Sequence, residues 1–228
     1  MTSSRRDKGV FASAERWATL RSEPAFLELV RLARVTNALA LVYPPIFVSH
    51  DDQSPAARRD RFAAMVYAGA LLHEGLHVAQ GLGKHFRDLK QYKEGFAKLL
   101  GDRGVGKFRT KTLDKVRDKL VFHVDRESIA KGLARYPEGE TLIATASDFS
   151  QGHSYFDLAD EVVLGYLFGD ALTADEYLAR VESFLGETSD LHSRYMRAAH
   201  SLIPAALRRM GCYRRSILRP QPPTDDTG

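Results

Sequence analysis

An arginine and a histidine near the middle of the chain have side chains suited to metal-free cleavage of RNA. Arg117 is followed by Asp118, and His123 stands six positions after the arginine. Histidine titrates near neutral pH, so it can take a proton from a 2′-hydroxyl or give one to a leaving oxygen. Arginine presents a fixed fork of donors to phosphate oxygens. Arg117 and His123 are therefore the first candidate catalytic pair.

Positive charge surrounds this pair. The cations that flank Arg117 are Lys107, Arg109, Lys111, Lys115 and Lys119. Such a stripe can follow a phosphate backbone, and we expect Lys111, Lys115 and Lys119 to contact RNA. In the alternative interpretation the stripe is a solvated helix face with the pairs Asp114–Arg117 and Lys115–Asp118, and His123 is a partly buried core residue.

The segment from Lys115 to His123 resembles the HEPN family, whose members carry an arginine, usually a polar residue after it, and a histidine a few residues further on. The resemblance covers this motif and the helical layout from roughly 22 to 209. It implies an all-α fold and a prokaryotic, metal-independent endoribonuclease, or an RNA-binding relative without catalysis. His123 would then be the acid and base, Arg117 the phosphate clamp and Asp118 an orienting group.

The same resemblance implies partners. Catalytic members of the family bring two such motifs together across a dimer interface, so a homodimer is expected. RNA is the expected substrate. A toxin–antitoxin or defence setting would add an antitoxin protein as a further partner.

A second candidate site lies earlier in the chain, where His73-Glu74-Gly75-Leu76-His77 reads as H-E-x-x-H. One helical turn brings both imidazoles to one side, where they can hold zinc while Glu74 activates a water molecule. This pattern predicts, as the enzymatic alternative, a zinc metallopeptidase or another zinc hydrolase. The leading interpretation needs no cofactor.

Four observations count against zinc. The continuation typical of one large metallopeptidase class would place glycine and histidine where Gln80 and Gly83 stand. A third ligand would have to come from Glu94, Glu161 or His153, and nothing marks one of them. Both histidines also border an apolar stripe, and the sequence before position 54 offers no edge strand to bind a substrate.

The elements that must position these residues are helices, because apolar residues recur at helical spacing through most of the chain. We expect helices over about 22–43, 54–81, 89–100, 110–133, 156–168 and 173–209. Gly81 and Gly83 are read as a helix end, and residues 101–106 as a glycine-rich loop. The prediction is an all-α, antiparallel up-and-down bundle of about five to six helices. An irregular insertion near 136–155 interrupts it, in which 141–145 is a weak candidate strand.

Composition bounds the remaining possibilities. The chain has 228 residues, 44% hydrophobic, with a formal net charge of +4, which is consistent with one globular domain over 1–212 and a disordered tail over 213–228. One cysteine excludes an internal disulfide. We find neither a secretory signal nor a span, so we expect a cytoplasmic protein with no membrane partner. A third functional class stays open, a helical interaction protein in which both motifs are coincidental.

Overall fold

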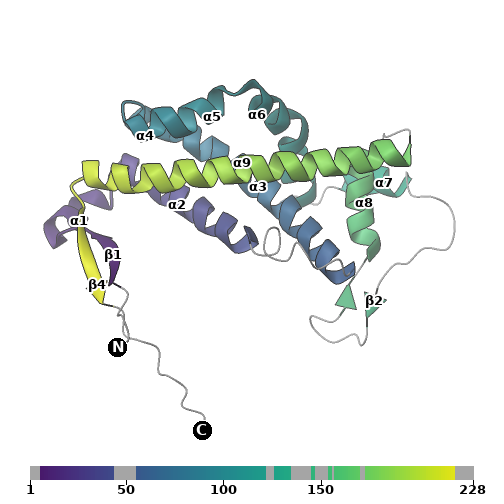
Figure 1. Cartoon of the computed structure of the whole chain (residues 1–228), viewed down its shortest axis with the longest axis horizontal. Coiled ribbons are helices and arrows are strands. Elements are labelled where there is room, and N and C mark those ends of the chain that lie inside the picture. Colours follow the sequence, from purple (N-terminus) through teal and green to yellow (C-terminus); the bar gives the residue numbers. More distant parts are fainter. Residues whose placement is uncertain are drawn as a thin grey trace, which may run out of the picture.

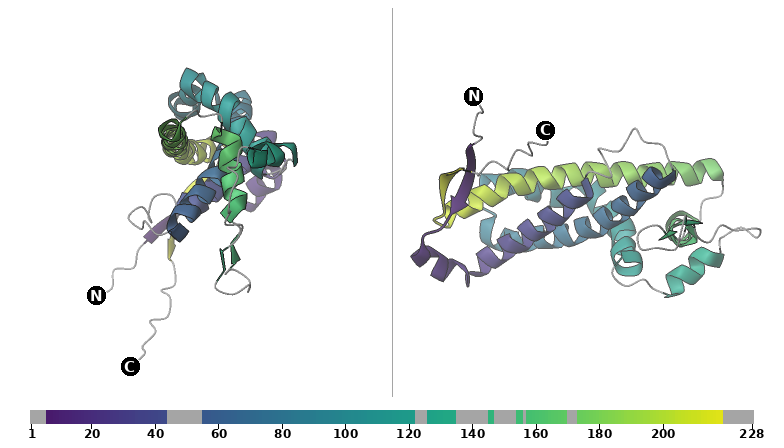
Figure 2. Two further views of the ribbon diagram at one scale, coloured as in Figure 1. Left: turned by 90° about the vertical axis from the view of Figure 1, so that its right-hand side faces the viewer. Right: turned by 90° about the horizontal axis from the view of Figure 1, so that it is seen from below.

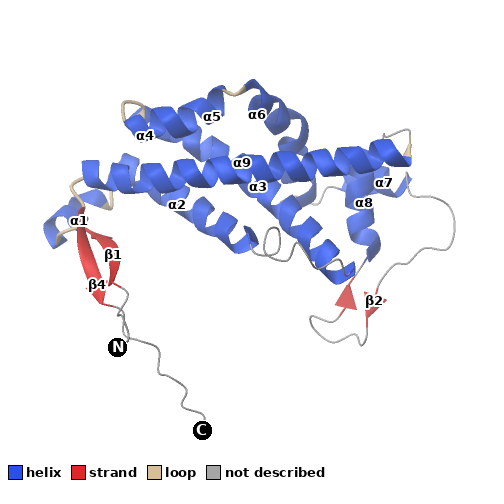
Figure 3. Cartoon of the chain, viewed as in Figure 1, coloured by secondary structure: helices blue, strands red, loops and turns tan. Residues whose placement is uncertain are grey.

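The computed structural model describes residues 6–43, 55–121, 126–134, 145–146, 154–155, 157–169 and 173–218. Helices dominate this part of the chain, which confirms the predicted all-α class (Figure 3). The longer helices are α1 (Ala14–Leu20), α2 (Pro24–Tyr43), α3 (Pro55–Phe86), α7 (Arg126–Ala134), α8 (Asp157–Phe168) and α9 (Ala174–Arg209). Among these residues no helix combines the length and apolarity that a bilayer span needs.

Between α3 and α7 the chain forms a series of short helical pieces, which we call the arm (residues 90–121). Its pieces are α4 (Lys90–Tyr92), η2 (Lys93–Ala97), α5 (Lys98–Gly101), α6 (Arg103–Phe108), η3 (Arg109–Leu113) and η4 (Val116–Val121). The three η segments are π-helical, with hydrogen bonds that reach five residues instead of four and turns that are correspondingly wider.

Helix α9 runs the length of the bundle, and the other long elements pack along it (Figures 1 and 2). Helix α2 is antiparallel to α3, since Glu28 near the start of α2 lies beside Gly81 near the end of α3. Helix α3 is parallel to α9, because Gly69 lies beside Phe184 and Gly75, further along α3, lies beside Tyr195, further along α9. In this bundle α2 and α3 are thus antiparallel, whereas α3 and α9, which the arm and later helices separate in the sequence, are parallel.

The arm runs alongside α9, antiparallel to it. Gly95 approaches Ala198, while Asp102, further along the arm, pairs with Arg194, which is earlier in α9. A Cβ on Gly95 would stand 2.9 Å from the Cβ of Ala198, so the glycine permits this close contact. Figure 1 shows α4, α5 and α6 as a layer along α9.

Two glycine-based predictions are wrong, for related reasons. Gly81 and Gly83 do not end α3, which continues to Phe86. A Cβ on Gly83 would stand 2.6 Å from the Tyr92 hydroxyl, which donates to the Ala79 carbonyl at 3.2 Å. Gly83 thus makes room for the Tyr92 side chain of the returning arm and does not mark the end of the helix.

The expected loop over 101–106 is reduced to a single break. Asp102 is the N-cap of α6, and its carboxylate accepts hydrogen bonds from the amides of Gly104 at 2.8 Å and Val105 at 3.3 Å. This cap satisfies amides that would otherwise lack a partner. A helix therefore resumes in spite of three glycines.

The expected disordered tail is wrong for its first residues. Tyr213–Leu218 forms β4, which pairs antiparallel with β1 (Arg6–Phe11) from Arg6↔Leu218 to Phe11↔Tyr213. The pairing partner is the opposite end of the chain, so no local pattern could reveal it. Residues 219–228 lie outside the described residues.

A second short ladder joins β2 (Thr145–Ala146) to β3 (Ser154–Tyr155) within the predicted insertion. The weak strand expected over 141–145 is met at Thr145, while 141–144 lie outside the described residues. The core of the bundle is formed by leucines and aromatic residues of α2, α3, the arm and α9, among them Leu32, Leu72, Leu76, Phe96, Tyr195 and Leu202.

Candidate functional site

The two candidate motifs meet in space. Arg117 in η4 donates from Nε to Oε1 of Glu74 in α3 at 2.7 Å. Its Nη1 pairs with the carboxylate of Asp118. Glu74 belongs to the H-E-x-x-H segment and Arg117 to the arginine–histidine segment. The structure therefore brings the central residues of both motifs into one polar cluster.

Packing of α3 on the arm explains why these residues meet. A Cβ on Gly69 would stand 3.5 Å from both Leu113 and Val116, so the apolar contact between the helices is centred there. His73 and Glu74 follow one turn later on α3, and Asp114 and Arg117 directly follow the two apolar arm residues. The polar residues thus form the border of a buried apolar contact. We define the central cluster as His73, Glu74, Asp114, Arg117 and Asp118.

His73 is held by a carboxylate from the arm. Its Nε2 lies 2.6 Å from Oδ1 of Asp114, and its Nδ1 lies 3.8 Å from Oε1 of Glu74. The side chain is only 14% exposed. Within the described residues Nδ1 has no hydrogen-bond partner. Asp114 therefore fixes the ring from one side, and the other ring nitrogen faces the carboxylate that holds Arg117.

Arg117 is both anchored and accessible, with 34% of its side chain exposed. The carboxylates of Asp118 and, second, Glu74 raise its pKa above the ordinary arginine value, so it is a permanent cation. Two of its three nitrogens are engaged, and among the described residues none bonds to Nη2. A guanidinium fixed on two sides with a third donor group left over is suited to bind an anion.

The remaining H-E-x-x-H residues do not share this environment. Leu76 is fully buried, and Gly75 lies beneath Tyr195, whose ring would be 2.7 Å from a Cβ at that position. His77 is exposed. His73 and His77 therefore differ in surroundings although they are one turn apart.

Among the described residues, no group of three or more His, Cys, Asp or Glu side chains is placed to hold a metal ion. Of the third ligands considered, Glu94 is exposed and lies 3.8 Å from Lys90. The side chain of Glu161 and the whole of His153 lie outside the described residues.

His123 also lies outside the described residues, so its distance from Arg117 stays a prediction. Lys111 in η3 and Lys115 between η3 and η4 are exposed. Lys119 belongs to η4, and its side chain is not among those described. The structure thus shows two of the three expected RNA-contacting lysines on the surface, at positions close in sequence to Asp114 and Arg117.

Sequence reasoning missed the partners inside the cluster. The alternative interpretation pairs Asp114 with Arg117 by i,i+3 spacing, whereas Asp114 pairs with His73 and Arg117 with Glu74 and Asp118. Spacing along one helix could not reveal a pairing between two helices. The sequence did contain one signal for this cluster: a polar residue directly follows each of two apolar arm residues, Asp114 after Leu113 and Arg117 after Val116.

Comparison of the chain with protein-family models, with curated proteins and with solved structures gives no match. The resemblance to HEPN proteins accordingly depends on the Arg117–Asp118…His123 motif and the helical layout, and family membership stays a proposal.

Proposed function

We propose that the chain is a metal-independent endoribonuclease of HEPN type, or an RNA-binding relative that has lost catalysis. The observation that carries the proposal is the state of Arg117. Carboxylates from α3 and η4 hold its guanidinium, the side chain is still 34% exposed, and Lys111 and Lys115, which precede it closely in the sequence, are exposed. A phosphodiester group is the ligand best matched to such a charged, oriented fork.

In the proposed reaction, the 2′-oxygen of the RNA attacks the adjacent phosphorus and loses its proton to a base. The bond to the 5′-oxygen breaks, that oxygen receives a proton from an acid, and a 2′,3′-cyclic phosphate forms. His123 fills one proton-transfer role, and the same residue of a second copy fills the other in a homodimer. Arg117 stabilises the negative charge that develops on the phosphorane oxygens.

Glu74 and Asp118 would act as positioning residues in this scheme. Neither carries a proton to the substrate. They fix the plane of the guanidinium before RNA binds, which lowers the cost of ordering a long side chain. This assigns Glu74 a role different from the water activation that a zinc mechanism would give it.

The test is cleavage of a mixed-sequence RNA in the presence of EDTA. Arg117→Lys keeps the charge and loses the fork, and His123→Ala removes the proton-transfer group, so we expect each to lower the cleavage rate by about 100-fold or more. Arg209→Lys is the matched control, because Arg209 makes a comparable two-oxygen contact with Asp88 at 2.6 and 2.7 Å, at the far end of α9. Circular dichroism must stay helical for all three.

The proposal would be refuted if both variants still cleaved RNA at the wild-type rate. It would also be refuted if Arg209→Lys lowered the cleavage rate as much as they do. The zinc alternative is separated by elemental analysis of the purified protein, for which a hydrolase requires about one zinc per chain. In that case EDTA would abolish activity and His73→Ala would release the metal. A protein that neither cuts nor retains RNA at low salt would instead be a helical interaction protein.

A further inference from the structure

The arm has a large excess of positive charge. Between positions 90 and 117 nine residues are lysine or arginine and three are aspartate or glutamate, a net charge of +6. The whole chain has a net charge of only +4, so the remaining residues together are acidic. The arm is thus strongly basic, as is the stretch 208–219, in which five residues are arginine and none is acidic.

The three acidic residues of this stretch are occupied by contacts of their own. Glu94 lies 3.8 Å from Lys90. Asp102 pairs with Arg194 of α9 at 2.7 Å and caps α6. Asp114 pairs with His73 at 2.6 Å. Two of the three carboxylates are therefore directed toward the bundle and do not neutralise the outer surface.

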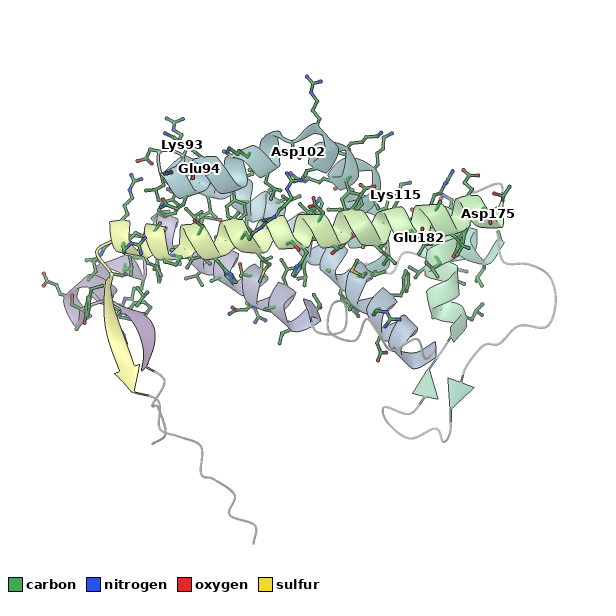
Figure 4. All side chains as sticks on the ribbon, in the orientation of Figure 1. Lys93, Glu94, Asp102, Lys115, Asp175 and Glu182 are labelled. Carbon is green, nitrogen blue, oxygen red and sulfur yellow. The ribbon has the colours of Figure 1, made fainter. Side chains whose placement is uncertain are left out.

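The cations of the arm, by contrast, face outward. Within the described residues no acidic partner lies within ion-pair distance of Lys93, Lys98, Arg103, Lys107, Arg109, Lys111 or Lys115. All except Arg109 are exposed. Figure 4 labels Lys93 and Lys115, which lie toward the two ends of the arm. The exposed charge therefore extends along the whole element.

Four of these cations recur at every fourth position: Arg103, Lys107, Lys111 and Lys115. In an α-helix a step of four residues overshoots a full turn by about 40°, so such a row would drift around the axis. The wider π turns of η3, which lies within this row, reduce the overshoot. The π-helical segment η3 thus helps to keep the row on one side of the helix. Arg117, two positions after Lys115, lies on the side of the arm that faces α3.

We propose that the outer face of the arm is a docking surface for the phosphate backbone of base-paired RNA. The choice of RNA rests on the proposed function. The surface would bind the substrate with little dependence on sequence and would direct one strand end or loop toward Arg117. It reaches well beyond the three lysines that the motif alone indicates.

The side chains of the arm favour a duplex backbone over other anionic partners. Proteins that bind single strands without sequence preference stack bases on exposed aromatic rings, but Tyr92, Phe96 and Phe108 are buried. A membrane-binding face would present large apolar side chains among its cations, and none of the exposed large hydrophobic residues belongs to the described arm. Charge without stacking or insertion groups matches backbone recognition.

Helix α9 extends this surface. A groove of about 350 Å³ lies between the arm and α9, with Leu99 and Gly95 among its lining residues. Lys98 borders it from the arm and Arg197 from α9, and both are exposed. The two cations lie on either side of one hollow, which Glu94 also lines.

The test measures binding without cleavage. The probe is a fluorescent RNA duplex with 2′-O-methyl groups, which lacks the nucleophile that the proposed reaction needs. The variant Lys93→Gln, Lys98→Gln, Arg103→Gln and Lys107→Gln leaves the central cluster intact. Since each phosphate contact adds about 0.9 to the slope of log affinity against log salt, we expect this slope to fall by about 3 to 4. Affinity at low salt should fall at least tenfold.

The matched control removes the same charge elsewhere, through Arg21→Gln, Arg34→Gln, Lys84→Gln and Arg87→Gln, all exposed residues outside the arm. The inference is overturned if both variants bind alike, if the unmodified protein does not bind the duplex at low salt, or if it prefers vesicles that contain phosphatidylserine. If binding depends on the arm but Arg117→Lys does not change cleavage, the docking surface stands and the proposed catalytic role fails.

Discussion

Single residues decide how closely the helices around the central cluster approach. Gly75 follows Glu74 directly, and a Cβ there would stand 2.7 Å from the ring and hydroxyl of Tyr195. Tyr195 is fully buried, and burial raises its pKa above the ordinary tyrosine value. A rigid ring in the core cannot move away cheaply. The glycine in the H-E-x-x-H segment therefore serves helix packing, which explains its place without reference to a metal.

This packing role gives a prediction for two glycines that both lie inside long helices. Gly75→Ala should lower the free energy of unfolding by about 1 to 3 kcal/mol, because the added methyl group overlaps Tyr195. Gly186→Ala should raise it by about 0.5 to 1 kcal/mol, since no atom lies within 4 Å of a Cβ there and alanine favours the helix. Urea unfolding measures both. Equal effects would show that Tyr195 does not limit this position.

At the scale of elements, the arm is attached to the bundle mainly by apolar contacts and a few polar ones. Phe96 and Leu99 are buried, and the Phe96 ring lies 5.2 Å from that of Tyr195. Asp102 adds the polar link to α9 and is also the cap that allows α6 to begin. Arg194 and, second, the capped amides hold the pKa of Asp102 below its ordinary value. One carboxylate thus fixes both the position of the arm and its local structure.

Two substitutions separate these roles of Asp102. Asp102→Asn retains a side-chain oxygen for the cap and loses the charge attraction to Arg194, whereas Asp102→Ala loses both. We expect melting temperatures in the order wild type, Asn variant, Ala variant at neutral pH. Because the lowered pKa favours the charged form in the folded protein, the difference between wild type and the Asn variant should shrink as pH falls toward the pKa of the folded state. A constant difference would argue against the ion pair.

Across the whole molecule, the packing of α2 against α9 encloses a titratable group. His192 of α9 is 2% exposed, and its Nε2 lies 3.3 Å from the carbonyl oxygen of Leu39 in α2. Burial lowers the pKa of His192 below the ordinary histidine value, and the bond to Leu39 only partly opposes this effect. The folded protein therefore keeps this ring neutral under conditions in which the unfolded chain would charge it.

The sign of the resulting pH dependence follows directly. As pH falls below the unfolded-state value of about 6.5, the unfolded chain takes up a proton at His192 before the folded protein does, so the free energy of unfolding decreases. We expect the loss of stability between about pH 8 and pH 5.5 to be smaller for His192→Gln than for wild type. His200→Gln, at an exposed position of the same helix, should retain the wild-type pH dependence. Equal pH dependence in both variants would contradict the prediction.

The sequence was sufficient where the determining interactions are local. Apolar spacing and capping residues gave α2, α8 and α9 nearly to their ends, and Thr173 does cap α9 by accepting from the amide of Glu176. The same local signals also gave the all-α class. They failed at Gly83, where the glycine accommodates the side chain of Tyr92 from the arm. They also failed at residues 101–106, where Asp102 caps a new helix.

Local patterns were therefore enough to predict the helical class, most helix positions and two groups of candidate site residues. The contact of Glu74 with Arg117, the contact of Asp114 with His73 and the pairing of β4 with β1 became known from tertiary packing alone. Helix propensity acts over a few neighbouring residues. A contact between two helices, or between two chain ends, depends on how all the apolar faces pack at once.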